Sequence, residues 1–222
     1  MGSVTDQSVQ KMTPALRVVH SRGRPRTARL RQRILAVAAR AFTERDFHDV
    51  LMDDVAHECG VAKGTLYLYF SSKRALYSAV LFDGLEHLYR TLQSVAACPS
   101  PPLDRLRGTM ACLLEHLRRR QLLTLLLRRE RLFRPAEARR WLRGRARVSR
   151  IVRSTISEAI VAGDLRAIDL PVGEEMLFAI VRGLNARGAR RPSIHRLAGR
   201  AMDIFLRGAG RSPRAEPRKR TG

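Results

Sequence analysis

The chain has 222 residues, 45% of them apolar, and its 43 basic and 20 acidic side chains give a formal net charge of +23. This apolar content is too high for a disordered polycation, and the lack of any run of about 18 uncharged apolar residues excludes a membrane-spanning helix. Three widely spaced cysteines (Cys59, Cys98 and Cys112) indicate reduced thiols rather than a disulfide framework. We therefore expect a soluble cytoplasmic protein with an anionic partner, nucleic acid being the first candidate.

The N-terminal residues 1–26 show no sustained apolar period and are predicted to form a flexible basic arm. Arg22, Arg24 and Arg26 alternate there with Gly23 and Pro25. An extended segment of this composition fits the narrow minor groove of A·T-rich DNA. The alternative is a solvated tail that binds phosphates without sequence preference.

A helix is predicted from Thr27, a candidate N-cap, to about Glu44, because its apolar residues recur every three or four positions. A short helix is expected over residues 52–59, with acidic residues in its first turn and Gly60 as its C-cap. A second short helix follows over residues 62–70. Two short helices joined by a glycine-containing turn, after a longer helix, are typical of a helix-turn-helix.

The second short helix carries the candidate DNA contacts, because the second helix of this motif enters the major groove. Gly64 removes a side chain where the backbone must approach DNA, and Thr65 offers a hydroxyl and a methyl group. Leu66 and Phe70 are expected to face inward. The candidate DNA-binding residues are Lys63, Gly64, Thr65, Tyr67, Tyr69 and Lys73. Of these, Lys63, Thr65 and Tyr67 are assigned to the groove and the bases, and Tyr69 and Lys73 to backbone phosphates.

The rest of the chain is also predicted to be helical, so the fold class is all-α. The expected helices cover residues 73–95, 103–119, 122–127, 135–162, 171–187 and 193–206. Gly163 is a predicted C-cap, and Met176 is expected on the inward face of its helix. Residues 208–222 are predicted to form a disordered basic tail.

The motif residues resemble the N-terminal domain of the tetracycline-repressor (TetR-type) family over about residues 27–80. The resemblance is carried by Val55-Ala56, Gly60-Val61, the run from Lys63 to Tyr67, Tyr69-Phe70, Ser72-Lys73 and Leu76. Two positions depart from the family pattern. Leu51 stands where a Ser or Thr usually caps the second helix, and Asp46 replaces a frequent glycine.

The resemblance implies a helix-turn-helix domain at residues 27–75 and a helical regulatory and dimerisation domain at residues 76–207. It also implies a homodimeric transcriptional regulator, usually a repressor, that binds a palindromic double-stranded DNA operator. A small-molecule effector entering the C-terminal domain would release the DNA. We expect the effector pocket between about Leu103 and Ala162, and the last two long helices are implied as the dimer interface.

The positive charge is unevenly distributed along the chain. Residues 51–94, which contain most of the motif, carry four basic and five acidic side chains, whereas residues 95–222 carry 29 and 11. Much of the excess lies in the arginine-rich residues 118–153. This run is interpreted as a solvated helix face, as a pocket for an anionic effector such as an acyl thioester or organic acid, or as an auxiliary DNA contact. The alternative function is a sequence-tolerant basic architectural DNA-binding protein.

Other chemistry finds little support in the sequence. Cys112, Glu115 and His116 share a helix face, but zinc or copper sites usually need a fourth ligand, so we expect no metal site. Trp141 falls on an apolar stripe and is expected in the core. No nucleotide-binding glycine loop or nucleophile elbow is present, so we predict no cofactor and no enzymatic activity.

Overall fold

The computed structural model describes residues 23–119, 133–186 and 194–209, and all the regular secondary structure in these ranges is α-helical. The helices are α1 (Gly23–Glu44), α2 (Met52–Glu58), α3 (Lys63–Tyr69), α4 (Lys73–Ala96), α5 (Pro102–Arg119), α7 (Pro135–Val161), α8 (Leu170–Ala186) and α9 (Ile194–Ala209). No helix among the described residues is long and apolar enough to cross a membrane. The all-α prediction is confirmed, and the predicted helix at residues 122–127 lies outside the described residues. The tail predicted from residue 208 begins within α9, which extends to Ala209, and its remainder lies outside the described residues.

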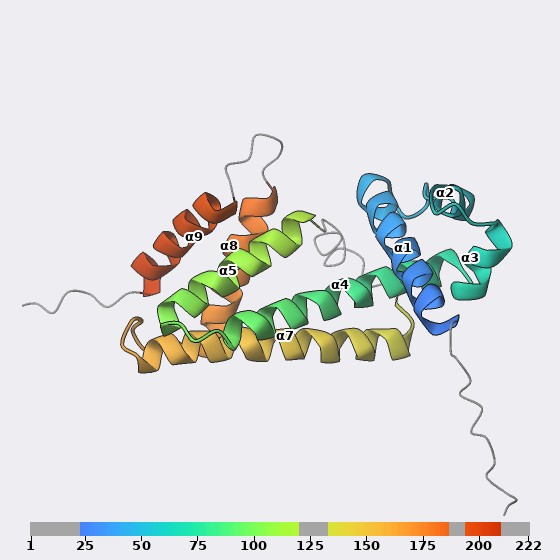
Figure 1. The fold of residues 1–222 in the computed structure, drawn as a ribbon. Helices are drawn as coiled ribbons and strands as arrows, with labels where there is room; N and C mark the ends of the chain where they lie inside the picture. The colour runs from blue at the N-terminus through green and yellow to red at the C-terminus, as the bar shows by residue number, and fades with distance from the viewer. Residues whose placement is uncertain (1–22, 120–132, 187–193, 210–222) are drawn as a thin grey trace, which may run out of the picture.

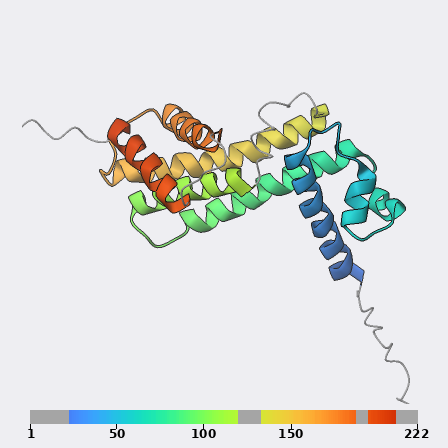
Figure 2. The same cartoon turned by 90° about the horizontal axis from the view of Figure 1, so that it is seen from above.

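The helices form a small head and a larger body, and α4 belongs to both (Figure 1). In the head, α1 packs against α4 and against α2, and α2 packs against α3. In the body, α5, α7, α8 and α9 pack together beside the rest of α4. Figure 2 shows α4 and α7 running side by side away from the head. The head therefore lies at one end of an elongated molecule, with α4 as its continuous connection to the body.

An apolar core holds α1 against α4 in the head. Ile34 and Phe42 on α1 are completely or almost completely buried, as their helical spacing predicts. The ring of Phe42 meets the edge of Tyr77 on α4, with 5.0 Å between ring centroids. Phe47, after α1, also packs on Tyr77, at 5.2 Å. Burying each such ring stabilises the fold by about 1.5–3 kcal/mol, so these contacts set the orientation of the head.

The helix ends follow the predicted signals at three positions. Gly60 and Gly163 have φ values of 62° and 82°, a backbone conformation that glycine adopts without strain. They follow the ends of α2 and α7. Ser72 caps α4, because its hydroxyl oxygen accepts a hydrogen bond of 3.1 Å from the amide of Ala75.

Two predictions differ from the observed structure. The first helix begins at Gly23 rather than Thr27, so Arg24 and Arg26 lie in a helical turn and not in an extended arm. Pro25 is compatible with this because a missing amide hydrogen is harmless in the first turn of a helix. Arg22 lies outside the described residues. Met176 was expected to face inward but is exposed on α8.

Leu51 is the N-cap residue of α2 and its side chain makes no capping hydrogen bond. We expect Leu51→Ser to raise the free energy of unfolding by about 1 kcal/mol, because the hydroxyl accepts a hydrogen bond from a free amide of the first turn. Urea denaturation of the full chain measures the change. Leu51 is 58% exposed, so little apolar burial is lost. Leu51→Ala is the matched control, and equal stability of the two variants would contradict the prediction.

Candidate DNA-recognition surface

Helix α3 has one buried face and one exposed face. Leu66 is fully buried and Phe70, at the C-cap, is 5% exposed, so both anchor the helix as predicted. Lys63, Gly64 and Tyr67 are exposed on the other side. Seven residues are too few for a helix that is stable alone, so the packing of Leu66 and Phe70 is what holds this surface in place.

Of the predicted contact residues, those on α3 lie together on or beside the exposed face. Thr65 and Tyr69 are half-buried, at its margins. A Cβ atom added to Gly64 would meet no atom within 4 Å. Nothing inside the protein therefore requires a glycine at this position, which agrees with a close approach from outside.

Lys63 pairs with a carboxylate of the preceding helix. Its ammonium nitrogen lies 2.9 Å from an oxygen of Asp53, and both side chains are exposed. This hydrogen bond raises the pKa of Lys63, so the ammonium stays protonated at neutral pH. An incoming DNA acceptor must compete with Asp53 for the ammonium hydrogens.

Lys73 is the first residue of α4 and makes contacts within the head. Its ammonium donates hydrogen bonds of 2.8 and 2.9 Å to the carbonyl oxygens of His48 and Val50. The same group lies 5.0 Å from the centre of the Phe47 ring. Lys73 thereby ties the loop between α1 and α2 to the start of α4, and one of its three donor hydrogens remains for a phosphate.

The structure adds Leu68 to the surface, a residue that the sequence reasoning did not select. Its side chain is 87% exposed in the middle of α3. An apolar side chain in such a place can meet a thymine methyl group in the major groove. The signal in the sequence was its position two residues after the buried Leu66, which places the two on opposite sides of a helix.

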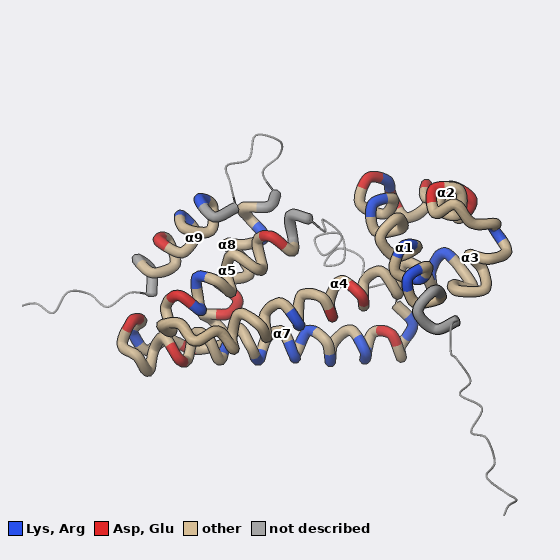
Figure 3. Tube along the Cα trace, in the orientation of Figure 1, with Lys and Arg blue, Asp and Glu red and all other residues tan. Residues whose placement is uncertain are grey.

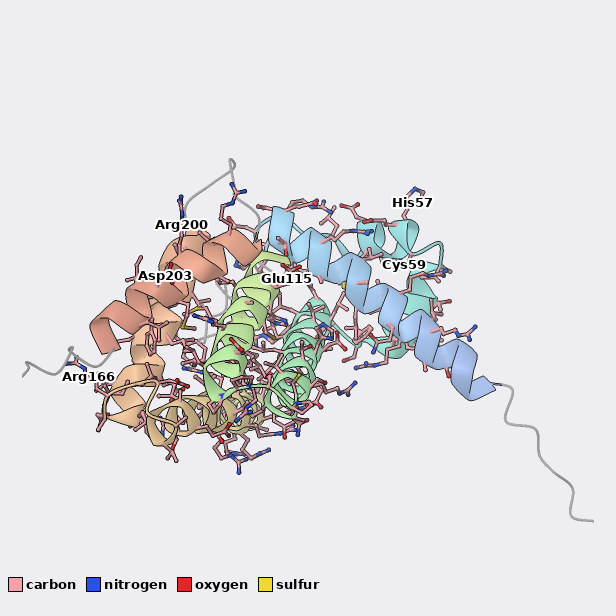
Figure 4. All side chains as sticks on the ribbon, turned by 60° about the vertical axis from the view of Figure 1, so that its left-hand side comes forward. His57, Cys59, Glu115, Arg166, Arg200 and Asp203 are labelled. Atoms are coloured by element: carbon pink, nitrogen blue, oxygen red, sulfur yellow. The ribbon has the colours of Figure 1, made fainter. Side chains whose placement is uncertain are left out.

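The candidate metal residues are placed together by the helical spacing but lack the chemistry of a metal site. Burial raises the pKa of the Cys112 thiol to about 11, so metal binding would have to displace a tightly held proton. His116 is buried and stacks on His87, with ring centroids 6.0 Å apart. Figure 4 shows Glu115 on α5 in the body. In the described part of the chain, no three metal-ligating side chains are grouped to hold an ion.

Cys59 and Trp141 both lie in the core. Cys59 is 2% exposed at the end of α2, and burial raises the pKa of its thiol, which makes the thiol less reactive. By contrast, the nearby His57 is exposed on α2 (Figure 4). Trp141 is buried, as predicted, and packs on Phe133 with 5.8 Å between ring centroids.

Several arginines of α7 act within the body. The guanidinium carbon of Arg140 lies 4.3 Å from the centre of the Phe82 ring. Arg153 donates a hydrogen bond to the buried carboxylate of Glu174. These arginines therefore cover apolar surface and form ion pairs within the body. The arginine-rich run at residues 118–153 also includes residues outside the described part of the chain.

Comparison with known proteins identifies the head. Residues 34–80 match the family model described as "Bacterial regulatory proteins, tetR family". The chain is 35% identical over 86 residues to the transcriptional activator FasR of Mycolicibacterium smegmatis, covering 39% of each protein. It is 30% identical over 90 residues to the repressor KstR2 of the same organism, covering 40% of this chain and 44% of the relative. The matches thus span less than half the length of these curated relatives.

Solved structures extend the similarity to the body. AibR, in complex with isovaleryl coenzyme A and operator DNA, superposes with a TM-score of 0.68 at 19% identity, over 79% of this chain and 97% of AibR. FadR of Bacillus subtilis, in complex with stearoyl-CoA, gives a TM-score of 0.65 at 16% identity, over 80% and 98%. The head and body together therefore have the fold of these proteins.

Replacing Lys73 tests whether its ammonium supports the head. We expect Lys73→Met to lower the free energy of unfolding by about 2 kcal/mol, because two carbonyl groups lose a charged donor. Chemical denaturation followed by circular dichroism measures this change. Lys63→Met is the matched control and should leave stability nearly unchanged, because its ion pair is exposed. Equal effects of the two substitutions would show that the Lys73 contacts add nothing to the fold.

Proposed function

We propose that the chain is a homodimeric transcriptional regulator of the TetR family, whose family model matches residues 34–80. It binds a palindromic DNA operator and releases it when a small molecule binds its helical body. The exposed face of α3 carries the proposal: Gly64, Tyr67 and Leu68 face outward while Leu66 is fixed in the core. We propose repression as the output, as the name of KstR2 states for that relative, whereas FasR is named an activator.

The exposed residues of α3 divide by their chemistry. Lys63, Thr65 and Tyr67 supply hydrogen-bond donors and acceptors and a methyl group for base edges in the major groove. Gly64 allows the α3 backbone to come close to the DNA. Tyr69 and the remaining donor of Lys73 are proposed to bind backbone phosphates, which position the helix without reading the sequence.

An apolar face on α8 supports dimer formation. Val172, Met176, Ala179 and Gly183 recur at spacings of three and four and are all exposed. On α9, Ile204 is 63% exposed, and Figure 4 shows Arg200 and Asp203 on the same helix. Exposed apolar side chains at regular spacing favour contact with a second copy of the same surface, which places two heads for successive major grooves.

The body offers an interior with unpaired polar groups for an effector. Thr109 on α5 and Trp141 on α7 are buried, and neither Oγ1 of Thr109 nor Nε1 of Trp141 has a hydrogen-bond partner in the described part of the chain. Both lie in the region expected to form the pocket. We propose an anionic acyl thioester as the effector class, supported by the arginine content of the body and by the coenzyme A thioesters bound in AibR and FadR.

Effector binding is proposed to act as a population shift. The ligand binds better to a form in which the two heads are wrongly spaced for the operator. Helix α4 transmits the change, because Leu76 is buried in the head and Leu88 in the body of the same helix. A displacement of α4 in the body must therefore move the head.

A gel-shift titration tests the proposed function against the architectural alternative. Duplexes from the region flanking its own gene are compared with shuffled duplexes, and we expect about 10³-fold tighter binding to one site. Tyr67→Ala and Gly64→Ala should lower this specific affinity at least tenfold while both proteins stay folded dimers. Equal affinity for all duplexes, falling steeply with salt, would instead identify an architectural protein.

Charge substitution tests the proposed dimer face. We expect Met176→Glu to convert the dimer to a monomer, because it places a carboxylate in an apolar contact between two copies. Light scattering after size-exclusion chromatography measures the mass. The control is Leu142→Glu, which alters an exposed leucine on α7. A Met176→Glu protein that remains dimeric would place the interface elsewhere.

A further inference from the structure

A slot between α4 and α7 lies in the body, separate from the exposed face of α3. It is a hollow of about 400 Å³, lined by Phe82, Leu85, Glu86, Tyr89, Arg140, Arg143, Gly144 and Arg147. We call it the α4–α7 slot. Its volume is within the range of small-ligand sites and too small for a macromolecule. Figure 3 shows several blue segments, Lys or Arg, along α7.

The close approach of the two helices depends on Gly144. A Cβ atom at this position would lie 2.5 Å from Cδ2 of Leu85, so a larger residue would require the Leu85 side chain or the helices to shift. The glycine also leaves the hollow open between the arginines on either side of it. The spacing of Arg140, Arg143 and Arg147 brings all three to the slot along one side of α7.

Two of these arginines are held by aromatic rings. The guanidinium carbon of Arg140 lies 4.3 Å from the centre of the Phe82 ring, and that of Arg147 lies 3.7 Å from the centre of the Tyr89 ring. Stacking uses the face of a guanidinium and leaves N–H donors at its edges for an acceptor. The arginines are therefore held in position before any ligand binds, which reduces the entropy lost on binding.

The charges that line the slot do not balance. Glu86 is the one carboxylate among the described lining residues, and it accepts hydrogen bonds from Arg147, at 3.0 Å, and from Arg90, at 3.2 Å. Among the residues that the structure describes, Arg143 makes no ion pair or hydrogen bond, and the contact recorded for Arg140 is the one with the Phe82 ring. Among the lining residues, three guanidinium groups and one carboxylate give a net charge of +2, and that carboxylate is shared with Arg90 outside the lining.

We propose that the α4–α7 slot binds a phosphate group that carries two negative charges, as in a phosphate monoester or a pyrophosphate. A dianion matches the net charge of the lining residues, and the planar guanidinium group binds phosphate oxygens through two parallel hydrogen bonds. Arg143 and Arg140 supply the main donors, and Arg147 adds a third while it stays paired with Glu86. The slot proposal extends the proposed function, and it rests on that function for one point: the phosphate is taken to be part of the effector.

The position of the slot explains how such a ligand would affect the head. Phe82, Glu86 and Arg140 also line a second hollow, which reaches Arg31 and Gln32 on α1. A phosphate held between α7 and α4 therefore acts close to the junction of body and head. The bound phosphate would fix the distance between α4 and α7 near the point where α4 passes from the head into the body.

Calorimetric titration of the full-length dimer tests the proposal. The probes are inorganic pyrophosphate, coenzyme A and adenosine, which separate a phosphate site from a site for the nucleoside. Trp141, the one tryptophan of the chain, follows Arg140 and provides a fluorescence signal for the same titrations. We expect pyrophosphate and coenzyme A to bind and adenosine not to bind.

The variant Arg140→Gln/Arg143→Gln should weaken binding of both phosphate probes at least tenfold, because two charged donors are lost. The matched control is Arg107→Gln/Arg182→Gln, which removes the same charge from exposed ion pairs elsewhere on the body. The single variant Arg143→Gln is a second test in which misfolding is not expected, because Arg143 is exposed on the surface. It should weaken binding on its own.

Equal weakening by the slot variant and the control would overturn the proposal, because binding would then follow net charge only. Unchanged binding in the slot variant would also overturn it. Operator release is measured separately by gel shift. If pyrophosphate and coenzyme A bind in the slot but never release DNA, the slot is supported and the effector mechanism fails. If a thioester releases DNA equally from wild type and slot variant, the proposed function is supported and the slot proposal fails.

Discussion

The structure depends on one continuous helix that is shared by two cores. Helix α4 has 24 residues, about 36 Å at the usual rise per residue, and no break separates its two ends. Tyr77 meets the aromatic cluster of the head, whereas Leu88 and Leu92 are buried in the body. Because a packed core resists deformation, the two ends cannot move independently. The head, its recognition helix and every site in the body are therefore mechanically connected through α4.

The recognition helix shows how much a short element depends on its surroundings. Helix α3 has neither a side-chain cap at its N-terminus nor the length to be stable alone. Its neighbour α2 also lacks a side-chain cap. Apolar anchoring through Leu66 and Phe70 replaces these local signals, and Lys73 holds the adjoining loop through the carbonyls of His48 and Val50. The exposed face of α3 is thus kept for contacts outside the protein.

The large positive charge serves several physical roles. The motif segment, residues 51–94, carries a net charge of −1, so the overall charge of +23 is no measure of operator recognition. In the body, Arg105 pairs with Glu158, and Arg153 pairs with the buried Glu174. Arg140 and Arg147 cover aromatic rings. In the α4–α7 slot, three arginines line the hollow together with one carboxylate, that of Glu86.

The sequence by itself determined the helix-turn-helix, the all-α class and most helix limits, because these follow from local signals such as apolar spacing, Gly60, Ser72 and Gly163. It also separated the inward Leu66 from the outward Tyr67, since helical geometry places neighbouring residues on different sides. Only the tertiary structure decided that Lys73 donates to loop carbonyls, that Met176 is exposed, and that Arg140, Arg143 and Arg147 border one slot with Phe82 and Tyr89. These features join segments far apart in the chain, and their geometry depends on how α4 packs against α1 and α7, which no local pattern specifies.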